Sequence, residues 1–299
     1  MSITPPYLQK GDRVAIICPA KKLPKPMDDA VKLLKSWGLE VELGQTVSAS
    51  YNQFAGDDNL RAADLQQYIN DTSIKAIFAA RGGYGTVRII DMVDFSKLLI
   101  HPKWIIGFSD ITVLHAHLSR QLGLTTLHGQ MPINIPDATA TSVETLKKAL
   151  FGEELTYNVS AHTLNRIGEG KGKLIGGNLA ILISVLGSVS DYDYEGKILF
   201  IEDVGEYLYS IDRMMYTLKR AGKLKNLAGL IVGGFTDLKD NDIPFGQTAA
   251  QIIKATVEEY DFPVCFDFPA GHVNDNYALK LEADVSLAVI LAGASIRFD

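Results

Sequence analysis

The chain has 299 residues, of which 47% are hydrophobic and 21% are charged, and its net charge is −6 at neutral pH with a pI near 5.6. A chain of this length and hydrophobicity can bury a large core, which excludes an intrinsically disordered protein. The acidic balance excludes binding driven by general attraction to nucleic acid or anionic membranes, so we expect a small-molecule or peptide partner.

Short apolar runs rich in β-branched residues alternate with amphipathic segments in the first half of the chain. This pattern predicts strands at 13–20, 39–44, 75–83 and 104–108, and helices at 28–38, at 57–71, after Gly85 and at 110–123. Such alternation is typical of a mainly parallel sheet with helices on both faces. Ligands bind at the carboxyl ends of such strands, where the sequences RGGYG (81–85) and GFSD (107–110) both lie.

The alternation breaks at 151–172, a polar stretch that contains several glycines. We interpret it as a boundary between an N-terminal α/β domain, residues 1–155, and a C-terminal domain, residues 156–299. In the second domain we expect a helix after GGN (176–178), strands at 197–206 and 227–235, helices at 210–222 and 248–260, and strand-like runs at 264–272, 277–290 and 294–299. The fold class is therefore α/β, with a C-terminal α/β domain that ends in β-rich segments.

The two cysteines, Cys18 and Cys265, lie in separate apolar runs, so we expect buried thiols and no disulfide framework. The first twenty residues lack the cationic segment followed by a long apolar stretch that marks a signal peptide. No run of about 18 apolar residues occurs elsewhere, which predicts no membrane span. A cytoplasmic protein is expected.

Ser109 stands between an apolar strand and a helical pattern, in the sequence GFSDI. A serine in this position resembles a nucleophile elbow, in which a tight turn exposes the hydroxyl and the next backbone N–H can face a developing oxyanion. The match is incomplete, because Ile111 occupies the position of the second glycine of that motif. The alternative is that Ser109 or Asp110 only caps the following helix.

A nucleophilic serine needs a base, and the chain offers six histidines: His101, His115, His117, His128, His162 and His272. His115 and His117 lie too far along the helix after Ser109 to reach back to it, so we expect packing or surface roles. His128 follows a predicted strand and could line the cleft, although a satisfied histidine at a strand end is the commoner case. His272 ends a strand and enters a polar loop, which makes it the best candidate base.

Glu202 and Asp203 interrupt the apolar strand at 197–206 near its carboxyl end. A carboxylate that holds the imidazole tautomer and stabilises the imidazolium completes the set that such chemistry needs. Solvated acids are also common at strand ends, which is the alternative for this pair. Together with Ser109 and His272, one of these acids gives the chain order serine, acid, histidine.

The glycines of RGGYG permit close backbone approach to an anion and leave N–H groups free to donate to it. The sequence is not G-x-G-x-x-G and has no P-loop lysine followed by serine or threonine, which disfavours a nucleotide site. It favours an oxyanion or carboxylate site.

Five motifs, RGGYG, GFSD, LIGGN, FIEDVGE and AGHVNDN, occur in this order at the ends of the predicted elements. Together they resemble the LD-carboxypeptidase family of serine peptidases. This family includes enzymes of peptidoglycan recycling and relatives that confer resistance to peptide-nucleotide antibiotics. The similarity extends over nearly the whole chain.

The resemblance implies a triad of Ser109, Glu202 and His272, with the serine on the first domain and the other two on the second. It implies oxyanion donors at the N–H groups of Asp110 and of a glycine in RGGYG, for which we choose Gly83. The implied activity is release of C-terminal D-Ala from the murein tetrapeptide, by cleavage after meso-diaminopimelate or L-Lys. A homodimer that needs no metal and no cofactor is also implied.

We expect the substrate to be bound by Arg81, Gly82 and Asn178. Arg81 and the N–H groups beside it exceed what one oxyanion needs, so this loop could also hold the terminal carboxylate of the substrate. Alternatively, Arg81 only braces the loop or pairs with a nearby acid. Two other functions stay open: hydrolysis of a peptidyl-nucleotide amide, and non-catalytic binding of an anionic ligand.

Overall fold

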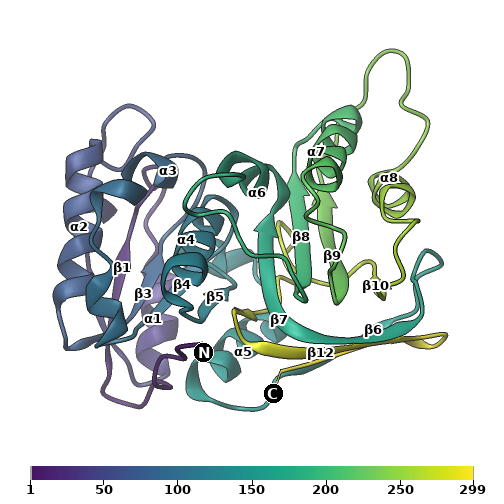
Figure 1. Ribbon diagram of the computed structural model, residues 1–299. Coiled ribbons are helices and arrows are strands. Elements are labelled where there is room, and N and C mark those ends of the chain that lie inside the picture. Colours follow the sequence, from purple (N-terminus) through teal and green to yellow (C-terminus); the bar gives the residue numbers. More distant parts are fainter. Residues whose placement is uncertain (1, 299) are drawn as a thin grey trace.

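A computed structural model describes residues 2–298 and contains two sheets that lie side by side (Figure 1). The first sheet has the strand order β11 (Leu279–Leu281), β5 (Thr126–His128), β4 (Trp104–Gly107), β3 (Ile74–Ala79), β1 (Arg13–Ile17) and β2 (Glu40–Leu43). Its neighbours are parallel except for β11, which comes from near the end of the chain and pairs antiparallel with β5. The predicted mainly parallel sheet is confirmed.

Helices cover both faces of this first sheet. They are α1 (Asp28–Ser36), α2 (Asp58–Asn70), α3 (Thr86–Ile89), α4 (Thr112–Leu122) and α5 (Ala140–Phe151), with short 3₁₀ turns η1 (Gln45–Val47), η2 (Ile90–Met92), η3 (Ser96–Leu99), η4 (Ser109–Ile111) and η5 (Pro132–Asp137). Successive strand residues pack on opposite sides, so that Ile17 joins the apolar cluster under α2 and α4, and Ile16 joins the cluster under α1 and α5. The helix predicted after Gly85 is a single turn.

The second sheet has the strand order β10 (Val264–Cys265), β9 (Gly229–Thr236), β8 (Ile198–Val204), β7 (Gly168–Asn178), β12 (Asp284–Ile290), β13 (Gly293–Phe298) and β6 (Thr156–Ser160). Strands β7 to β10 are parallel, whereas β12, β13 and β6 form an antiparallel extension. The helices of this half are α6 (Leu179–Val185), α7 (Leu208–Arg220) and α8 (Ala249–Thr256). The expected α/β arrangement with β-rich closing segments is confirmed.

The stretch 151–172 contains more structure than its composition indicates, because β6 and the first half of β7 lie in it. Gly170 and Gly172 of β7 face the backbone carbonyls of Ala228 and Gly196, which occupy the space that a side chain would need. The glycines therefore serve close backbone packing and not chain flexibility. The domain boundary between residues 155 and 156 stays a prediction.

Both cysteines are buried, and burial raises the pKa of each thiol to about 12, so neither is poised to react. Between Ser2 and Phe298, no helix has the length and apolar character needed to cross a membrane.

Candidate active site

The turn after β4 holds Ser109 in a conformation that few residues adopt. Its φ is +63°, in the left-handed region, immediately after the extended residue Phe108. Such strain in a non-glycine residue between a strand and a helix is the backbone feature of a nucleophile elbow. Ile111 takes the place of the second glycine of that motif, and its side chain packs where a Cβ on Gly107 would lie, 2.9 Å away.

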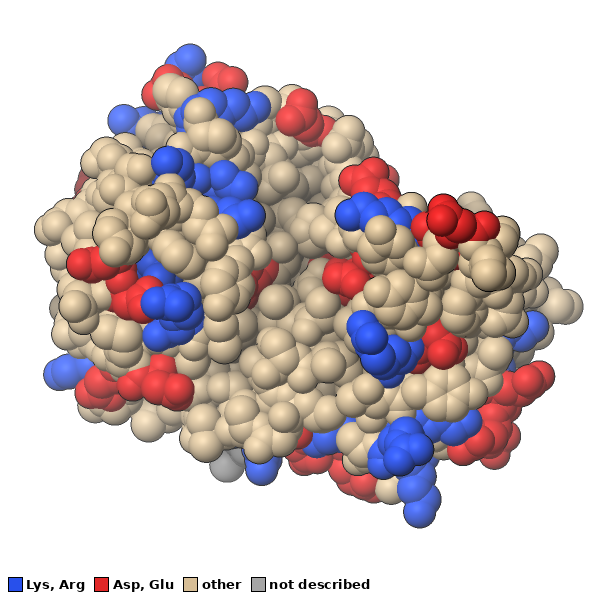
Figure 2. All heavy atoms as spheres, turned by 90° about the horizontal axis from the view of Figure 1, so that it is seen from above, with Lys and Arg blue, Asp and Glu red and all other residues tan. Residues whose placement is uncertain are grey.

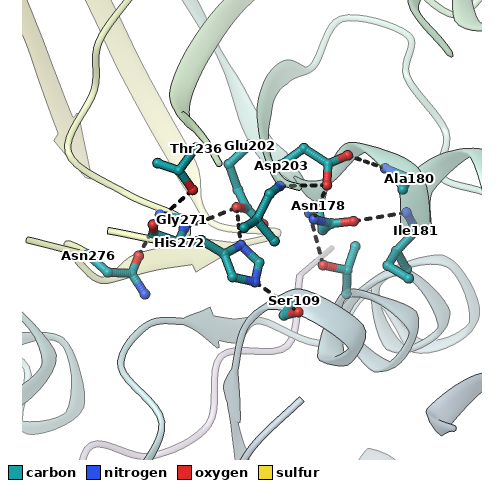
Figure 3. A network of polar contacts seen from close by, with 12 residues as sticks. Ser109, Asn178, Ala180, Ile181, Glu202, Asp203, Thr236, Gly271, His272 and Asn276 are labelled. Atoms are coloured by element: carbon teal, nitrogen blue, oxygen red, sulfur yellow. Dashed lines mark hydrogen bonds and ion pairs between the residues drawn. The ribbon is translucent and has the colours of Figure 1, made fainter. Parts of the chain in front are cut away.

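Three residues that are remote in sequence meet at this turn (Figure 3). The Ser109 hydroxyl lies 3.1 Å from Nε2 of His272, and Nδ1 of His272 lies 2.7 Å from Oε2 of Glu202. The same carboxylate oxygen accepts the backbone N–H of His272 at 3.2 Å. Because the carboxylate only accepts at Nδ1, that nitrogen carries the proton and Nε2 presents its lone pair to the serine.

Glycine at position 271 is required by this arrangement. Its φ is +110°, and a Cβ built on it would lie 2.6 Å from Cβ of Glu202. The loop can therefore pass directly over the buried carboxyl group and place His272 against it.

Opposing effects act on the pKa of His272. Burial by itself lowers this pKa, but the hydrogen bond that Nδ1–H donates to Glu202 and the charges of Glu202, Asp203 and Asp237 outweigh burial and hold the pKa above its ordinary value. Ser109 and His272 are half-buried, so solvent and ligands can reach both.

Asp203 faces away from His272 and supports the opposite side of the site. Its Oδ1 accepts from Nδ2 of Asn178 at 2.9 Å and from the backbone N–H of Val204 at 2.8 Å, and its Oδ2 accepts from the N–H of Ala180 at 2.9 Å. Burial raises the pKa of Asp203 to about 6. Of the two adjacent acids, only Glu202 contacts the imidazole.

Asn178, expected from the sequence to bind substrate, is buried and engaged with protein groups. Its side-chain oxygen accepts from the N–H of Ile181 at the start of α6, and its backbone N–H donates to Thr112 at 3.1 Å. Thr112 begins α4, directly after the Ser109 turn. Asn178 thus joins the two halves of the molecule, and these contacts give no support to a substrate-binding role.

A second network, which the sequence did not reveal, holds the histidine loop. The N–H of Gly271 donates to Oδ1 of Asn276 at 2.8 Å, and Nε2 of His128 lies 3.0 Å from the same oxygen. Burial lowers the pKa of His128 to about 3, so the ring is neutral and its Nε2 carries the proton. His128 is therefore a buried donor and not a base. Asn276 ends the motif AGHVNDN, but its contact with His128 joins residues 148 positions apart, so the motif alone did not indicate this role.

The RGGYG loop lies against the nucleophile turn. A Cβ on Gly82 would be 3.0 Å from Cβ of Ser109 and 3.3 Å from the backbone nitrogen of Asp110. The Asp110 carboxylate accepts from the N–H and hydroxyl of Thr86, at 2.9 and 2.7 Å, which caps α3 and fastens the loop. Neither η4 nor α4 has a side-chain cap, so capping of the following helix is not the role of Ser109 or Asp110.

The remaining predicted residues of the loop differ in their surroundings. Nη1 of Arg81 donates to the backbone carbonyl of Lys22 at 2.8 Å, which matches the bracing alternative for this arginine. Gly83, chosen as an oxyanion donor, has φ +112° and packs against the side chain of Lys21, whereas Gly82 touches Ser109. That the N–H of Gly83 donates to the oxyanion stays a prediction, and the N–H of Gly82 is the other candidate.

Seen from the top of Figure 1, a hollow separates the two halves of the molecule, and basic and acidic side chains stand around it (Figure 2). This face carries the carboxyl ends of the parallel strands, as the fold predicts for a ligand site. A serine, a neutral imidazole and a buried carboxylate that are linked in this order by hydrogen bonds can perform nucleophilic acyl transfer. Within residues 2–298, no group of three or more His, Cys, Asp or Glu residues is arranged to hold a metal ion.

Comparison with known proteins identifies the family. Family models described as the LD-carboxypeptidase N-terminal and C-terminal domains match residues 14–129 and 171–287. A probable murein peptide carboxypeptidase of Bacillus subtilis (strain 168) is 36% identical, with 99% of this chain and 96% of that protein covered. The chain belongs to the LD-carboxypeptidase family and is a serine-type hydrolase of that family.

Solved structures share the fold. The crystal structure of muramoyltetrapeptide carboxypeptidase from Oxalobacter formigenes aligns with a TM-score of 0.87 at 27% identity, covering 96% of this chain and 98% of that one. The microcin C7 self-immunity protein MccF in complex with aspartyl sulfamoyl adenosine aligns with a TM-score of 0.88, covering 99% and 98%. Its sequence is 20% identical, so this second likeness concerns the fold alone.

Proposed function

We propose that the enzyme removes the C-terminal D-Ala from murein tetrapeptide, as a cytoplasmic, homodimeric peptidase of peptidoglycan recycling. The single observation that supports this type of reaction is the chain of hydrogen bonds that links Ser109, His272 and Glu202. The substrate class is supported by the relatives, which bear the names murein peptide carboxypeptidase and muramoyltetrapeptide carboxypeptidase.

In the proposed mechanism, His272 accepts the hydroxyl proton as Ser109 attacks the scissile carbonyl carbon. Glu202 keeps Nδ1 protonated and stabilises the imidazolium that forms. The imidazolium then gives its proton to the leaving D-Ala nitrogen, and water attacks the acyl-enzyme with His272 again as the base.

The N–H of Asp110 and an N–H of the RGGYG loop are the proposed donors to the oxyanion. The strained turn at Ser109 places the Asp110 nitrogen beside Gly82, and the carboxylate of Asp110 fastens the same loop through Thr86. The donors are therefore held before the substrate arrives, which is the condition for effective electrostatic stabilisation of the transition state.

The rate should depend on pH through His272. Only the neutral imidazole can accept the serine proton, and the pKa of His272 is held above its ordinary value of 6.5. We therefore expect kcat/KM to rise with pH and to reach its plateau at a higher pH than an unperturbed histidine would give. A pH profile between 5 and 9 measures this. A plateau already complete at pH 5 would contradict His272 as the base.

Hydrolysis of a peptidyl-nucleotide amide receives less support as an alternative. Both tryptophans, Trp37 and Trp104, are buried and cannot stack on a base, so stacking would have to come from an exposed tyrosine such as Tyr84 of the RGGYG loop.

To test the proposed function, the enzyme is incubated with murein tetrapeptides that end in meso-diaminopimelyl-D-Ala or L-Lys-D-Ala, and the products are analysed by mass spectrometry. We expect loss of one alanine. A tetrapeptide ending in L-Ala should be turned over far more slowly, and Ser109→Ala is the inactive control. A folded wild-type preparation that leaves both D-Ala peptides intact would contradict the proposal.

A further inference from the structure

A carboxypeptidase must recognise the terminal carboxylate of its substrate close to the nucleophile. That carboxylate belongs to the leaving residue, so its carbon is three bonds from the attacked carbonyl carbon, a separation of about 4 Å. The recognising group must therefore reach the immediate surroundings of Ser109. Gly82 and Gly83 form the adjoining wall, since Gly82 packs directly against Ser109.

The side chain of Lys21 lies along this wall. A Cβ built on Gly83 would be 2.5 Å from Cδ of Lys21 and 3.2 Å from its Cε, so the aliphatic stem covers the glycine. The charge of Lys21 also reaches the nucleophile turn: burial raises the pKa of Asp110, while hydrogen bonds from Thr86 and then the charges of Arg61 and Lys21 oppose that rise. Cε of Lys21, which carries the ammonium group, thus lies beside Gly83, the residue that follows the glycine packed against Ser109.

Other cations near the loop are already paired. Arg61 is buried, forms an ion pair with Asp58 and donates to the carbonyl of Gly85 at 2.9 Å. Arg88 forms an ion pair with the same aspartate. Both guanidinium groups therefore support the loop and have their charge balanced by protein.

Arg81 and Lys21 differ in role: Arg81 supports the backbone beside this loop, whereas the ammonium group of Lys21 is not used in an ion pair with any described residue. Arg81 donates to the carbonyl of Lys22, and the N–H of Lys22 donates to the carbonyl of Gln53 at 3.0 Å, so the backbone beside Lys21 is held from two sides. Lys21 itself makes no ion pair with any carboxylate of the chain between residues 2 and 298. A fixed backbone with an uncompensated ammonium group is preorganised for an anionic ligand.

We propose that Lys21 binds the terminal carboxylate of the substrate, and that Arg81 acts by bracing the turn that carries Lys21. This assignment, which rests on the function proposed above, makes Lys21 the residue that determines carboxypeptidase specificity. The ammonium group donates charge-assisted hydrogen bonds to the carboxylate, and the glycine wall lets the leaving residue approach the backbone closely.

The test compares a tetrapeptide ending in L-Lys-D-Ala with the same peptide ending in D-Ala-amide. The wild-type enzyme should prefer the free acid by about 30- to 1000-fold in kcat/KM, because the amide leaves the ammonium group unpaired. In Lys21→Met, whose side chain still covers Gly83, kcat/KM for the acid should fall about 10- to 100-fold while the value for the amide stays unchanged. Lys21→Arg should keep most of the preference.

Lys22→Met is the matched control, since Lys22 is the neighbouring lysine and its side chain donates to Ser50 at the surface. This variant should behave as wild type. If Lys21→Met prefers the acid over the amide as strongly as wild type does, the proposal is overturned. If Arg81→Met at the same time loses this preference, Arg81 is the residue that binds the carboxylate. Melting temperatures show that each variant is folded.

A binding measurement distinguishes a failure of the proposed function from a failure of the Lys21 assignment. If the wild-type enzyme cleaves neither peptide, calorimetry with the Ser109→Ala variant still compares the Kd of the acid and the amide. Tighter binding of the acid that disappears in Ser109→Ala/Lys21→Met supports carboxylate recognition by Lys21. Equal Kd values for acid and amide in Ser109→Ala overturn it.

Discussion

Ser109→Ala and His272→Ala are each expected to lower kcat by about 10⁴- to 10⁶-fold, and the double variant should be hardly slower than either single one. The reason is that the hydroxyl and the imidazole act as one unit, 3.1 Å apart, so removal of either already abolishes nucleophilic attack. Single-turnover and steady-state rates on the murein tetrapeptide measure the effect. Residual activity should come from the oxyanion donors and substrate binding alone.

Multiplicative losses in the double variant would show that the two residues act independently and would contradict the triad. His115→Gln is a suitable comparison. His115 lies on α4 after the same turn, but it is buried, with Nδ1 2.8 Å from Thr126 and Nε2 2.9 Å from the carbonyl of Gly107. This change should lower stability and leave the chemical step largely intact.

Glu202→Gln is expected to reduce kcat by about 10³- to 10⁴-fold, which is less than the loss of the nucleophile. Glutamine cannot stabilise the imidazolium, and its amide can present a donor to Nδ1, which favours the wrong tautomer. The carboxylate is also the main group that raises the pKa of His272 against the effect of burial. The pH at which the remaining activity rises should therefore move to a lower value, which a pH profile of the variant detects.

Asp203→Asn separates the two adjacent acids. Asp203 accepts hydrogen bonds from three N–H groups and does not touch His272, so we expect a lower melting temperature and a comparatively small change in kcat. The opposite pattern, with Asp203→Asn nearly inactive and Glu202→Gln close to wild type, would mean that Asp203 is the acid of the triad.

The sequence by itself was sufficient for the α/β class and for the positions of most strands in the first half. The apolar runs that became β3 and β4 are buried on both faces, so their hydrophobicity is continuous and easily recognised. The same reasoning selected Ser109, Glu202 and His272 because they follow or interrupt apolar runs. The strand predicted at 264–272 is wrong in its length, since β10 ends at Cys265 and His272 lies in the loop that follows.

Only the tertiary structure decided which polar groups face the reaction and which support it. Glu202 and Asp203 are adjacent acids of similar chemistry, but successive strand residues point to opposite sides, so one meets His272 and the other meets Asn178. Asn276 and His128 are 148 positions apart, and β11 joins a sheet whose other strands all come from the first half. Gly170 and Gly172 resembled a linker because the carbonyls that exclude their side chains come from chain segments far beyond them. Contacts between remote segments depend on how the sheets pack, and a local pattern of residue types carries no record of that packing.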